Sequence, residues 1–416
     1  MTTLPISLTP DERPLRQAQA LHWVTSHGHA AVLGAHGEPY PYGPFPHLMA
    51  AGAAATYTGH PGQAFEPPAG RLWLGALSYD YGCSLQDATL PGTAGFDFFS
   101  PLYLLAWDDE GLTLQGPDPA WAWAHICAQT PEPWAIPTGQ ISHSLPYDAY
   151  AQGVDRILQY LREGEAYEVN FCKFEQVCLP EPPSLPGLYR ALTVRSPMPF
   201  QFLYQSPGLQ MAGSSPERFL RREAGRLISQ PIKGTAPRGT TPEADAALAQ
   251  HLRRHEKTLA ENMMITDLVR NDLAQVCQPG TVAVEELFGL YTFERIHQLI
   301  TTVGGACPPG PTDWPALLRA TFPMGSMTGA PKQRALAMIA ETEAQARGYF
   351  SGAVGYIMPD GDFDLAVVIR SLFVAGCTVS YAAGGAIVWD STAAEEWAEA
   401  DLKLEAMRHV LGTGPK

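Results

Sequence analysis

One stretch decides how the rest of this sequence is interpreted: Pro231-Ile232-Lys233-Gly234-Thr235-Ala236-Pro237-Arg238-Gly239. The prolines in this stretch restrict the backbone, and the glycines allow it to bend tightly. The preceding residues 225–230, Gly-Arg-Leu-Ile-Ser-Gln, predict a short strand that leads into the stretch. We therefore expect Lys233 at the end of a strand, where the backbone can approach a small ligand closely.

Two interpretations of Lys233 follow from this position. A lysine amine is a nucleophile only when it is neutral, and burial or a cationic neighbour such as Arg238 would lower its pKa. The alternative is a surface turn with a solvated lysine, which is the usual environment of this residue type. The nine residues leave both interpretations open, and the rest of the chain has to decide between them.

The composition indicates an acidic globular protein. The chain has 416 residues, of which 45% are hydrophobic and 17% are charged, so it is long enough to bury a large core. Its formal net charge is −15, and no basic stretch is present, so nucleic acid is not expected as a partner. An anionic ligand would need a local cluster of cations or a bound metal.

The cysteines and the apolar segments predict a cytoplasmic protein without a membrane partner. Seven cysteines are scattered without the spacing of a metal site, which is typical of reduced thiols. No run of 18 apolar residues occurs, and residues 1–14 lack the apolar core of a leader peptide.

Two acidic residues have unusual sequence surroundings. A proline in the apolar strand expected over residues 209–219 predicts an edge or bulge that turns Glu217 out of the ladder; the alternative is a solvated glutamate beside Arg218. A long helix is expected over residues 242–274, and it places Glu261 on a largely apolar stripe. A carboxylate there needs a partner or a cation.

Three later segments are suited to binding an anion or a metal. The glycine-rich loop 322–332 enters a helix and is not a Walker A loop. Arg370 interrupts a Val/Ile run, which indicates either a core ion pair or an anion site. In the last helix, Glu396, Glu399 and Lys403 share one face, although an exposed Glu399–Lys403 pair worth a few tenths of a kcal/mol would explain the spacing equally well.

Eight blocks of the sequence, in order, resemble the chorismate-utilising family, which includes anthranilate synthase component I, aminodeoxychorismate synthase component I, isochorismate synthases and salicylate synthases. The blocks are Gly164–Phe171, Ser214–Leu220, Pro231–Arg238, Glu256–Asp272, Phe322–Lys332, Gly348–Tyr356, Ile369–Ser371 and Ala383–Lys403. The resemblance implies an α+β fold, with two large, mostly antiparallel sheets packed as a sandwich and helices outside. Residues 1–140 would form the N-terminal region of component I type, and residues 145–410 the chorismate-binding catalytic region.

Within this family, Lys233 resembles the aminodeoxychorismate branch, which carries Pro-Ile-Lys-Gly-Thr where anthranilate synthases carry alanine in place of the lysine. Isochorismate and salicylate synthases place their water-activating lysine at the position of Glu168. Glu168 also departs from the glutamine that several aminodeoxychorismate synthases have there. Gln298 stands where the family often has a histidine, with His297 one residue earlier.

The resemblance implies an enzyme that aminates chorismate at C4 with ammonia, giving 4-amino-4-deoxychorismate for 4-aminobenzoate and folate synthesis. Lys233 would attack C2 of the ring in a covalent step, and Glu217 would protonate the departing C4 hydroxyl. Two alternatives remain at this point. The first is anthranilate synthase component I, which releases anthranilate and pyruvate; the second is a subunit that binds an acid ligand without turnover.

The resemblance also implies the ligands of the site. Mg²⁺ held by Glu261 and Glu399, with Glu396 as an additional or alternative ligand, would bind the ring carboxylate. Arg370 and Tyr356 would hold the enolpyruvyl carboxylate. The pocket would be completed by Lys403, Thr328, Thr235, Gly384 and Gly385. No segment of this chain resembles a glutaminase or a lyase domain, so a separate glutamine amidotransferase subunit is expected to supply ammonia.

Overall fold

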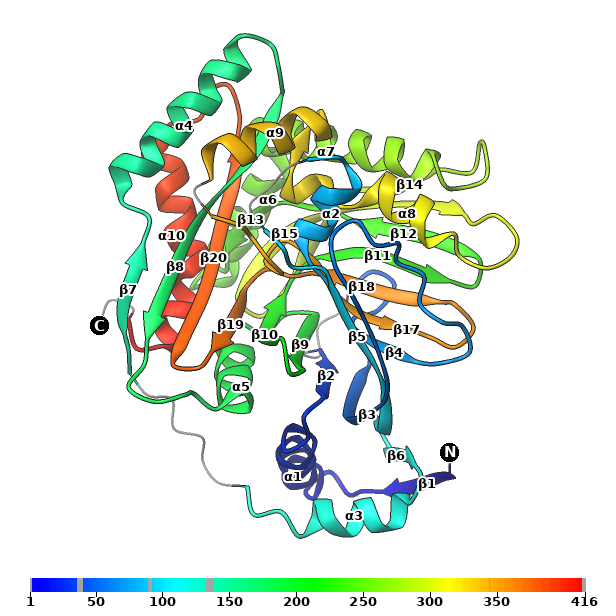
Figure 1. The fold of residues 1–416 in the computed structure, drawn as a ribbon. Coiled ribbons are helices and arrows are strands. Elements are labelled where there is room, and N and C mark those ends of the chain that lie inside the picture. Colours follow the sequence, from blue (N-terminus) through cyan, green and yellow to red (C-terminus); the bar gives the residue numbers. More distant parts are fainter. Residues whose placement is uncertain (1, 36–39, 89–91, 132–137, 344, 414–416) are drawn as a thin grey trace.

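The computed structural model describes residues 2–35, 40–88, 92–131, 138–343 and 345–413 (Figure 1). The helices in these ranges are α1 (Arg13–Thr25), α2 (Tyr79–Leu85), α3 (Pro119–Cys127), α4 (Tyr147–Arg162), α5 (Leu185–Arg195), α6 (Pro242–Arg254), α7 (Glu256–Ala274), α8 (Trp314–Thr321), the 3₁₀ turn η1 (Gly325–Met327), α9 (Lys332–Thr342) and α10 (Ala393–Val410). The strands in the first half are β1 (Thr2–Ser7), β2 (Ala30–Gly34), β3 (His47–Gly59), β4 (Trp73–Leu77), β5 (Phe96–Trp107), β6 (Gly111–Gly116), β7 (Gln140–Ser144), β8 (Glu168–Cys178), β9 (Phe200–Gln205) and β10 (Gln210–Ser215). The strands in the second half are β11 (Arg218–Glu223), β12 (Arg226–Gln230), β13 (Ile232–Pro237), β14 (Ala283–Thr292), β15 (Ile296–Ala306), β16 (Gly329–Ala330), β17 (Ala353–Ile357), β18 (Phe363–Val367), β19 (Ser371–Ala375) and β20 (Thr378–Ile387).

The strands pair antiparallel throughout, which confirms the predicted α+β class with mostly antiparallel sheets. The pairing runs in the order β7, β8, β20, β19, β10, β9, β2, β3, β5, β4, β17, β18, β11, β12, β15, and β15 then carries both β13 and β14. The two layers expected from the sequence are therefore parts of one hydrogen-bonded network that folds back on itself. Strands from the first 140 residues join later ones through the β2–β9 and β4–β17 pairs.

The core lies between the folded parts of this network. One buried cluster combines side chains from β9 and β10, such as Phe202 and Met211, with side chains from β4, β17 and β18, such as Leu74, Val354 and Ala366. Helices cover the outside, and α4 and α10 lie along β8 and β20 (Figure 1). The tyrosine and apolar face of α4 packs against β8, which follows from the 3–4 spacing of its apolar residues.

Two local predictions have different outcomes. Glu217 lies outside the ladder, because β10 ends at Ser215, β11 begins at Arg218, and the β11 register shifts beyond Arg218, as expected of a bulge. The single helix predicted over residues 242–274 is wrong. His255 has an extended conformation, with φ −73° and ψ 103°, and its side chain accepts a hydrogen bond from the Thr258 N–H, so it caps α7 and separates it from α6.

A fully buried arginine fastens the loop after β2 to the sheet. The Arg218 guanidinium pairs with Asp364 through two hydrogen bonds of 2.8 and 2.9 Å, and it also donates to the carbonyl oxygens of Pro41 and Gly43. The Arg218 side chain is 0% exposed and the Asp364 side chain is 1% exposed. Each of the two charges lost its hydration on burial, and the interaction with the other charge compensates for that loss.

We predict that Asp364→Ala lowers the free energy of unfolding by about 3–5 kcal/mol, because it leaves the Arg218 charge buried and unpaired. Urea denaturation followed by circular dichroism measures this change. The matched control is Asp267→Ala, which breaks an ion pair with Arg270. The Asp267 side chain is 62% exposed and the Arg270 side chain is 52% exposed. The control should cost less than about 1 kcal/mol, and equal losses in the two variants would contradict the prediction.

Candidate active site

Lys233 forms a buried ion pair that the sequence did not predict. Its Nζ lies 2.6 Å from Oε1 of Glu168, which is the first residue of β8. The Lys233 side chain is 11% exposed and the Glu168 side chain is 0% exposed, so the interpretation of Lys233 as a solvated surface lysine is wrong. The two strands that carry these residues are far apart in the order of the sheet, and its folding brings them together.

The expected effect of Arg238 on Lys233 is also wrong. Arg238 binds the Asp245 carboxylate at 2.8 and 2.9 Å rather than acting on Lys233. Burial, the largest influence, does lower the pKa of Lys233, but the carboxylates of Glu168, Glu261 and Glu217 more than compensate, so the pKa lies above its usual value. In this state Lys233 is an ammonium ion.

The position of Lys233 is fixed from the side of α7. The Asn262 amide donates to the Lys233 carbonyl oxygen at 3.3 Å and accepts a hydrogen bond from the Thr301 hydroxyl on β15 at 2.7 Å. The next residue, Gly234, has φ +97°, and a Cβ there would lie 2.3 Å from Cγ2 of Thr258 on α7. Glycine is thus required both by the backbone conformation and by the close approach of the helix.

Glu217 has the environment of a carboxylic acid that can donate a proton near neutral pH. Its side chain is buried, and the Ser326 hydroxyl donates to its Oε1 at 2.7 Å. Burial raises the pKa of Glu217 to about 7, against the opposing effects of the Ser326 hydrogen bond and the Lys233 charge. Ser326 belongs to the glycine-rich loop that the sequence singled out, which brings that loop to Glu217.

The glutamates expected to hold a metal lie on α7 and α10. Burial raises the pKa of Glu261, and the negative charge of Glu399 adds to this effect. Burial likewise raises the pKa of Glu396, which accepts a 2.6 Å hydrogen bond from the Ser391 hydroxyl and also faces the charge of Glu399. The charge of Glu399 therefore acts on both of the other carboxylates.

Carboxylate oxygens are the type of ligand that a hard divalent cation prefers, although these three do not form a complete cage. No group of three or more His, Cys, Asp or Glu side chains in the described ranges is already arranged to hold a metal ion. Gly385 leaves room beside the carboxylates, because a Cβ there would lie 3.0 Å from Oε2 of Glu396 and 3.5 Å from Oε1 of Glu399. Carboxylate oxygens with space for further ligands suit an ion that keeps bound water or takes a substrate oxygen.

A cationic group lies next to these carboxylates. Lys403 pairs with Glu399 at 2.6 Å, as the spacing on the helix predicts, and it also donates to the Gly384 carbonyl oxygen at 2.7 Å. The Arg370 guanidinium donates to the Lys403 carbonyl oxygen at 3.3 Å. Burial lowers the pKa of Arg370 to about 10, and it has no carboxylate within ion-pair distance in the described part of the chain, so its charge remains available to an anion.

The remaining expected binding residues are placed differently. The Thr328 hydroxyl donates to the Met324 carbonyl oxygen at 3.1 Å and is fully buried in the glycine-rich loop. Thr235 is exposed on β13, where it accepts a 3.5 Å hydrogen bond from the Gln298 amide. Tyr356 packs in the core beside Phe45, opposite Asp364 on the neighbouring strand.

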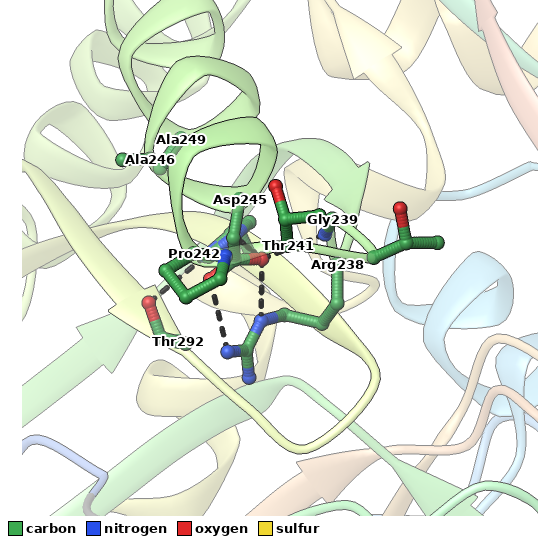
Figure 2. A pocket seen from close by; sticks show the side chains of 10 residues that line it. Arg238, Gly239, Thr241, Pro242, Asp245, Ala246, Ala249 and Thr292 are labelled. Atoms are coloured by element: carbon green, nitrogen blue, oxygen red, sulfur yellow. Dashed lines mark hydrogen bonds and ion pairs between the residues drawn. The ribbon is translucent and has the colours of Figure 1, made fainter.

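A cavity lies beyond the end of β13, and Lys233 is not among the residues that line it. This open cavity of about 520 Å³ is lined by Arg238, Gly239, Thr240, Thr241, Pro242, Asp245, Ala246, Ala249, Thr292 and His297 (Figure 2). His297 is buried there, with one ring nitrogen 2.9 Å from the Thr292 hydroxyl and the other 2.9 Å from Asp245. Both nitrogens are engaged in holding α6 to the β14–β15 hairpin, which indicates a structural role.

The sequence missed Glu168 and Ser326 as partners of the central residues. A glutamate at the start of an apolar strand, in Tyr167-Glu168-Val169-Asn170-Phe171, was the available signal for the first, because a charge in such a strand needs a partner. No signal distinguished Ser326 from other loop serines. All seven cysteines are free thiols, and no helix in the described ranges is long and apolar enough to cross a bilayer.

The chain belongs to the chorismate binding enzyme family, whose sequence profile matches residues 19–409. Within this class it is 39% identical over 284 residues to an aminodeoxychorismate synthase of Streptomyces griseus, with 68% of this chain and 39% of that protein covered. It is 43% identical over 270 residues to an aminodeoxychorismate synthase of Streptomyces pristinaespiralis, with 63% and 36% covered. The chain thus matches less than half of the length of these relatives.

Other relatives carry a different name. An anthranilate synthase component 1 of Aeropyrum pernix is 33% identical over 327 residues, with 76% of this chain and 72% of that protein covered. Anthranilate synthase component I from Streptococcus pneumoniae has a similar structure, with a TM-score of 0.72, 25% identity, and 83% and 82% coverage. The menaquinone-specific isochorismate synthase from Escherichia coli shares the fold, with a TM-score of 0.78, 19% identity, and 99% and 94% coverage.

We predict that the Glu217 carboxyl titrates near pH 7 and that Ser326→Ala raises this pKa further, because the variant removes a hydrogen bond that stabilises the charged form. Infrared difference spectra of the carboxyl band, with Glu217→Gln as the reference, measure the midpoint. Ser229→Ala is the control, since that buried hydroxyl donates to the Phe219 carbonyl oxygen instead. A midpoint near the ordinary value of 4.5 in the unaltered protein would contradict the prediction.

Proposed function

We propose that this protein aminates chorismate at C4 with ammonia to give 4-amino-4-deoxychorismate, a precursor of 4-aminobenzoate. The observation that carries this proposal is the electrostatic interaction of a buried lysine, Lys233, with a buried glutamate, Glu217, whose raised pKa suits it to donate a proton. The names of the Streptomyces relatives support the same reaction. Lys233 is the feature that separates this proposal from anthranilate formation, since the family resemblance associates alanine at that position with anthranilate synthases.

In the proposed mechanism Lys233 attacks C2 of the ring while the C4 hydroxyl departs. Hydroxide is a poor leaving group, so Glu217 protonates the oxygen and water leaves. Ammonia then adds at C4 and displaces the lysine. Dividing the substitution into two steps in this way lets a positioned side chain act as the first nucleophile, which is the usual benefit of covalent catalysis.

The proposed binding groups lie around α10. Chorismate is a dianion, and the acidic chain must offset that charge locally. Arg370 is proposed to hold one carboxylate, with Lys403 and the Gly384–Gly385 backbone beside it. Mg²⁺, when bound by Glu261, Glu399 and Glu396, would supply positive charge at the ring carboxylate. The ammonia is proposed to come from a glutamine amidotransferase subunit.

We predict that Lys233→Met lowers kcat by 1,000-fold or more, on the order of the losses seen when a nucleophile is removed. The assay incubates the protein with chorismate, Mg²⁺ and an ammonium salt at mildly alkaline pH and identifies the product by mass. The expected product keeps the enolpyruvyl group and exchanges OH for NH₂. Anthranilate plus pyruvate would refute the proposed reaction.

The matched control for this prediction is Lys173→Met. Lys173 is also a buried lysine in an ion pair, with Asp401 at 2.6 Å, but it lies further along β8 and packs on the Trp397 ring. The control should keep kcat within about threefold per folded molecule. Equal losses in the two variants would show that only the stability of the fold was measured.

We predict that Mg²⁺ raises the melting temperature of the chain without substrate, because an ion that binds only the folded state stabilises it by mass action. Glu261→Gln should raise at least tenfold the Mg²⁺ concentration required for the same rise in melting temperature, since it removes a proposed ligand charge. Differential scanning fluorimetry with a Mg²⁺ titration measures both. Glu285→Gln, which removes a carboxylate that pairs with Arg226 on the β14 side, is the control, and an equal response of the two variants would contradict the proposed site.

A further inference from the structure

We propose that Glu168 is the proton acceptor of Lys233: its carboxylate takes a proton from the lysine as the amine attacks and returns it when the lysine leaves. This inference rests on the proposed function and assigns a role to a residue that departs from the glutamine of several related enzymes. The carboxylate would make direct contact with the reacting nitrogen, which defines a catalytic rather than a structural residue.

The geometry of the pair is that of a proton-transfer contact. Oε1 of Glu168 lies 2.6 Å from Nζ of Lys233, a distance at which a charge-assisted hydrogen bond already joins the two groups. Oε2 of Glu168 is buried and has no hydrogen-bond partner in the described part of the chain. Because the second oxygen receives no hydrogen bond, no donor stabilises the charged form of the carboxyl group there. Protonation of Glu168 therefore breaks no existing hydrogen bond at this oxygen.

Among the described residues, Glu168 is the carboxylate best placed to take this proton, since Glu261 also acts on Lys233 but is not within ion-pair distance of its Nζ. Glu217 has to be protonated already in order to act as the acid, and its Oε1 accepts the Ser326 hydrogen bond. The carboxylates around Lys233 raise its pKa, so the free amine is scarce at neutral pH. Bulk water has little access to the pair, because the Lys233 side chain is 11% exposed and Glu168 is fully buried. The acceptor therefore has to lie inside the site, and Glu168 is the carboxylate within ion-pair distance of Nζ among the described residues.

The proton balance closes over the two steps. In the first step a proton moves from the Lys233 ammonium to Glu168, the amine forms a bond to C2, and the C4 hydroxyl takes the Glu217 proton and leaves as water. The adduct is then a secondary ammonium, beside neutral Glu168 and ionised Glu217. In the second step ammonia adds at C4, Lys233 leaves as an amine and regains its proton from Glu168, and the new C4 ammonium gives its proton to Glu217.

The first test compares catalysis with the chemical reactivity of the lysine. Glu168→Gln should lower kcat on the order of 100-fold, the usual contribution of a positioned base, with the KM for chorismate within about threefold. The same variant should react faster with cyanate at Lys233, by about tenfold for each unit by which the Lys233 pKa falls once the anion is lost. Peptide mass spectrometry measures this carbamylation at pH 8.

These opposite signs support the proposal only when both rates are measured on folded protein, because unfolding would also lower kcat and expose Lys233 to cyanate. Unfolding would speed the carbamylation of the buried Lys173 as well, whereas loss of the Glu168 charge should speed that of Lys233 alone. Glu175→Gln is the matched control, because Glu175 is a buried glutamate on the same strand that pairs with Arg408. The control should change neither the kcat per folded molecule nor the carbamylation of Lys233 by more than about threefold.

The second test restores the base from solution. Glu168→Ala leaves a cavity the size of the lost carboxymethyl group. Acetate should therefore raise the kcat of this variant at least tenfold. Nitrate, a planar anion of similar shape that is not basic, should not raise it. Equal rescue by the two anions would overturn the proposal, because it would show that only negative charge is needed, and so would a Glu168→Gln variant with near-normal kcat.

The outcomes for the reaction and for Glu168 are distinguishable. If the unaltered protein produced no aminated chorismate, the proposed function would fail, while the carbamylation rates would still decide whether Glu168 keeps Lys233 protonated. In the unaltered protein Lys233 should react with cyanate more slowly than Lys257, whose side chain is 38% exposed. A faster reaction at Lys233 would overturn the ion pair, and with it the proposed proton transfer, without any variant.

Discussion

The ion pair between Lys233 and Glu168 sets the constraint on which the site depends. It joins β13 to β8, two strands that lie near opposite ends of the pairing order of the sheet, so it can form only when the network folds back on itself. Both charges are buried, and a buried charge without its partner is strongly destabilising. The pair therefore ties the closure of the sandwich to the position of the proposed nucleophile.

Two glutamates near this pair have different environments, which suit them to different proposed roles. Burial raises the pKa of Glu217 to about 7 against the opposing effect of the Ser326 hydrogen bond, whereas Glu399 is partly exposed and pairs with Lys403. Burial raises the pKa of Glu399, but the Lys403 charge and hydrogen bond outweigh this effect, so its pKa lies below the usual value. Two glutamates can thus serve as an acid and as an anionic ligand because their environments shift their pKa values in opposite directions.

The same arrangement reconciles the acidic composition of the chain with the anionic substrate that we propose. Cations gather on one side of the site, where Arg370 and Lys403 contact one another through the α10 backbone. Arg218, by contrast, pairs with Asp364 and donates hydrogen bonds to backbone carbonyl oxygens deep in the fold. A carboxylate thus neutralises Arg218, whereas Arg370 has none within ion-pair distance among the described residues.

The sequence by itself determined the family through eight ordered blocks, and this resemblance implied the α+β class and drew attention to Lys233, Glu217, Glu261 and Glu399. The blocks could be found because glycine and proline spacing and charges in apolar segments are local signals. Only the tertiary structure decided which groups meet. The partner of Lys233 is Glu168 rather than Arg238, and His255 divides one expected helix into two. These outcomes depend on contacts between strands distant in sequence, and a local pattern carries no information about the register in which a large sheet folds back on itself.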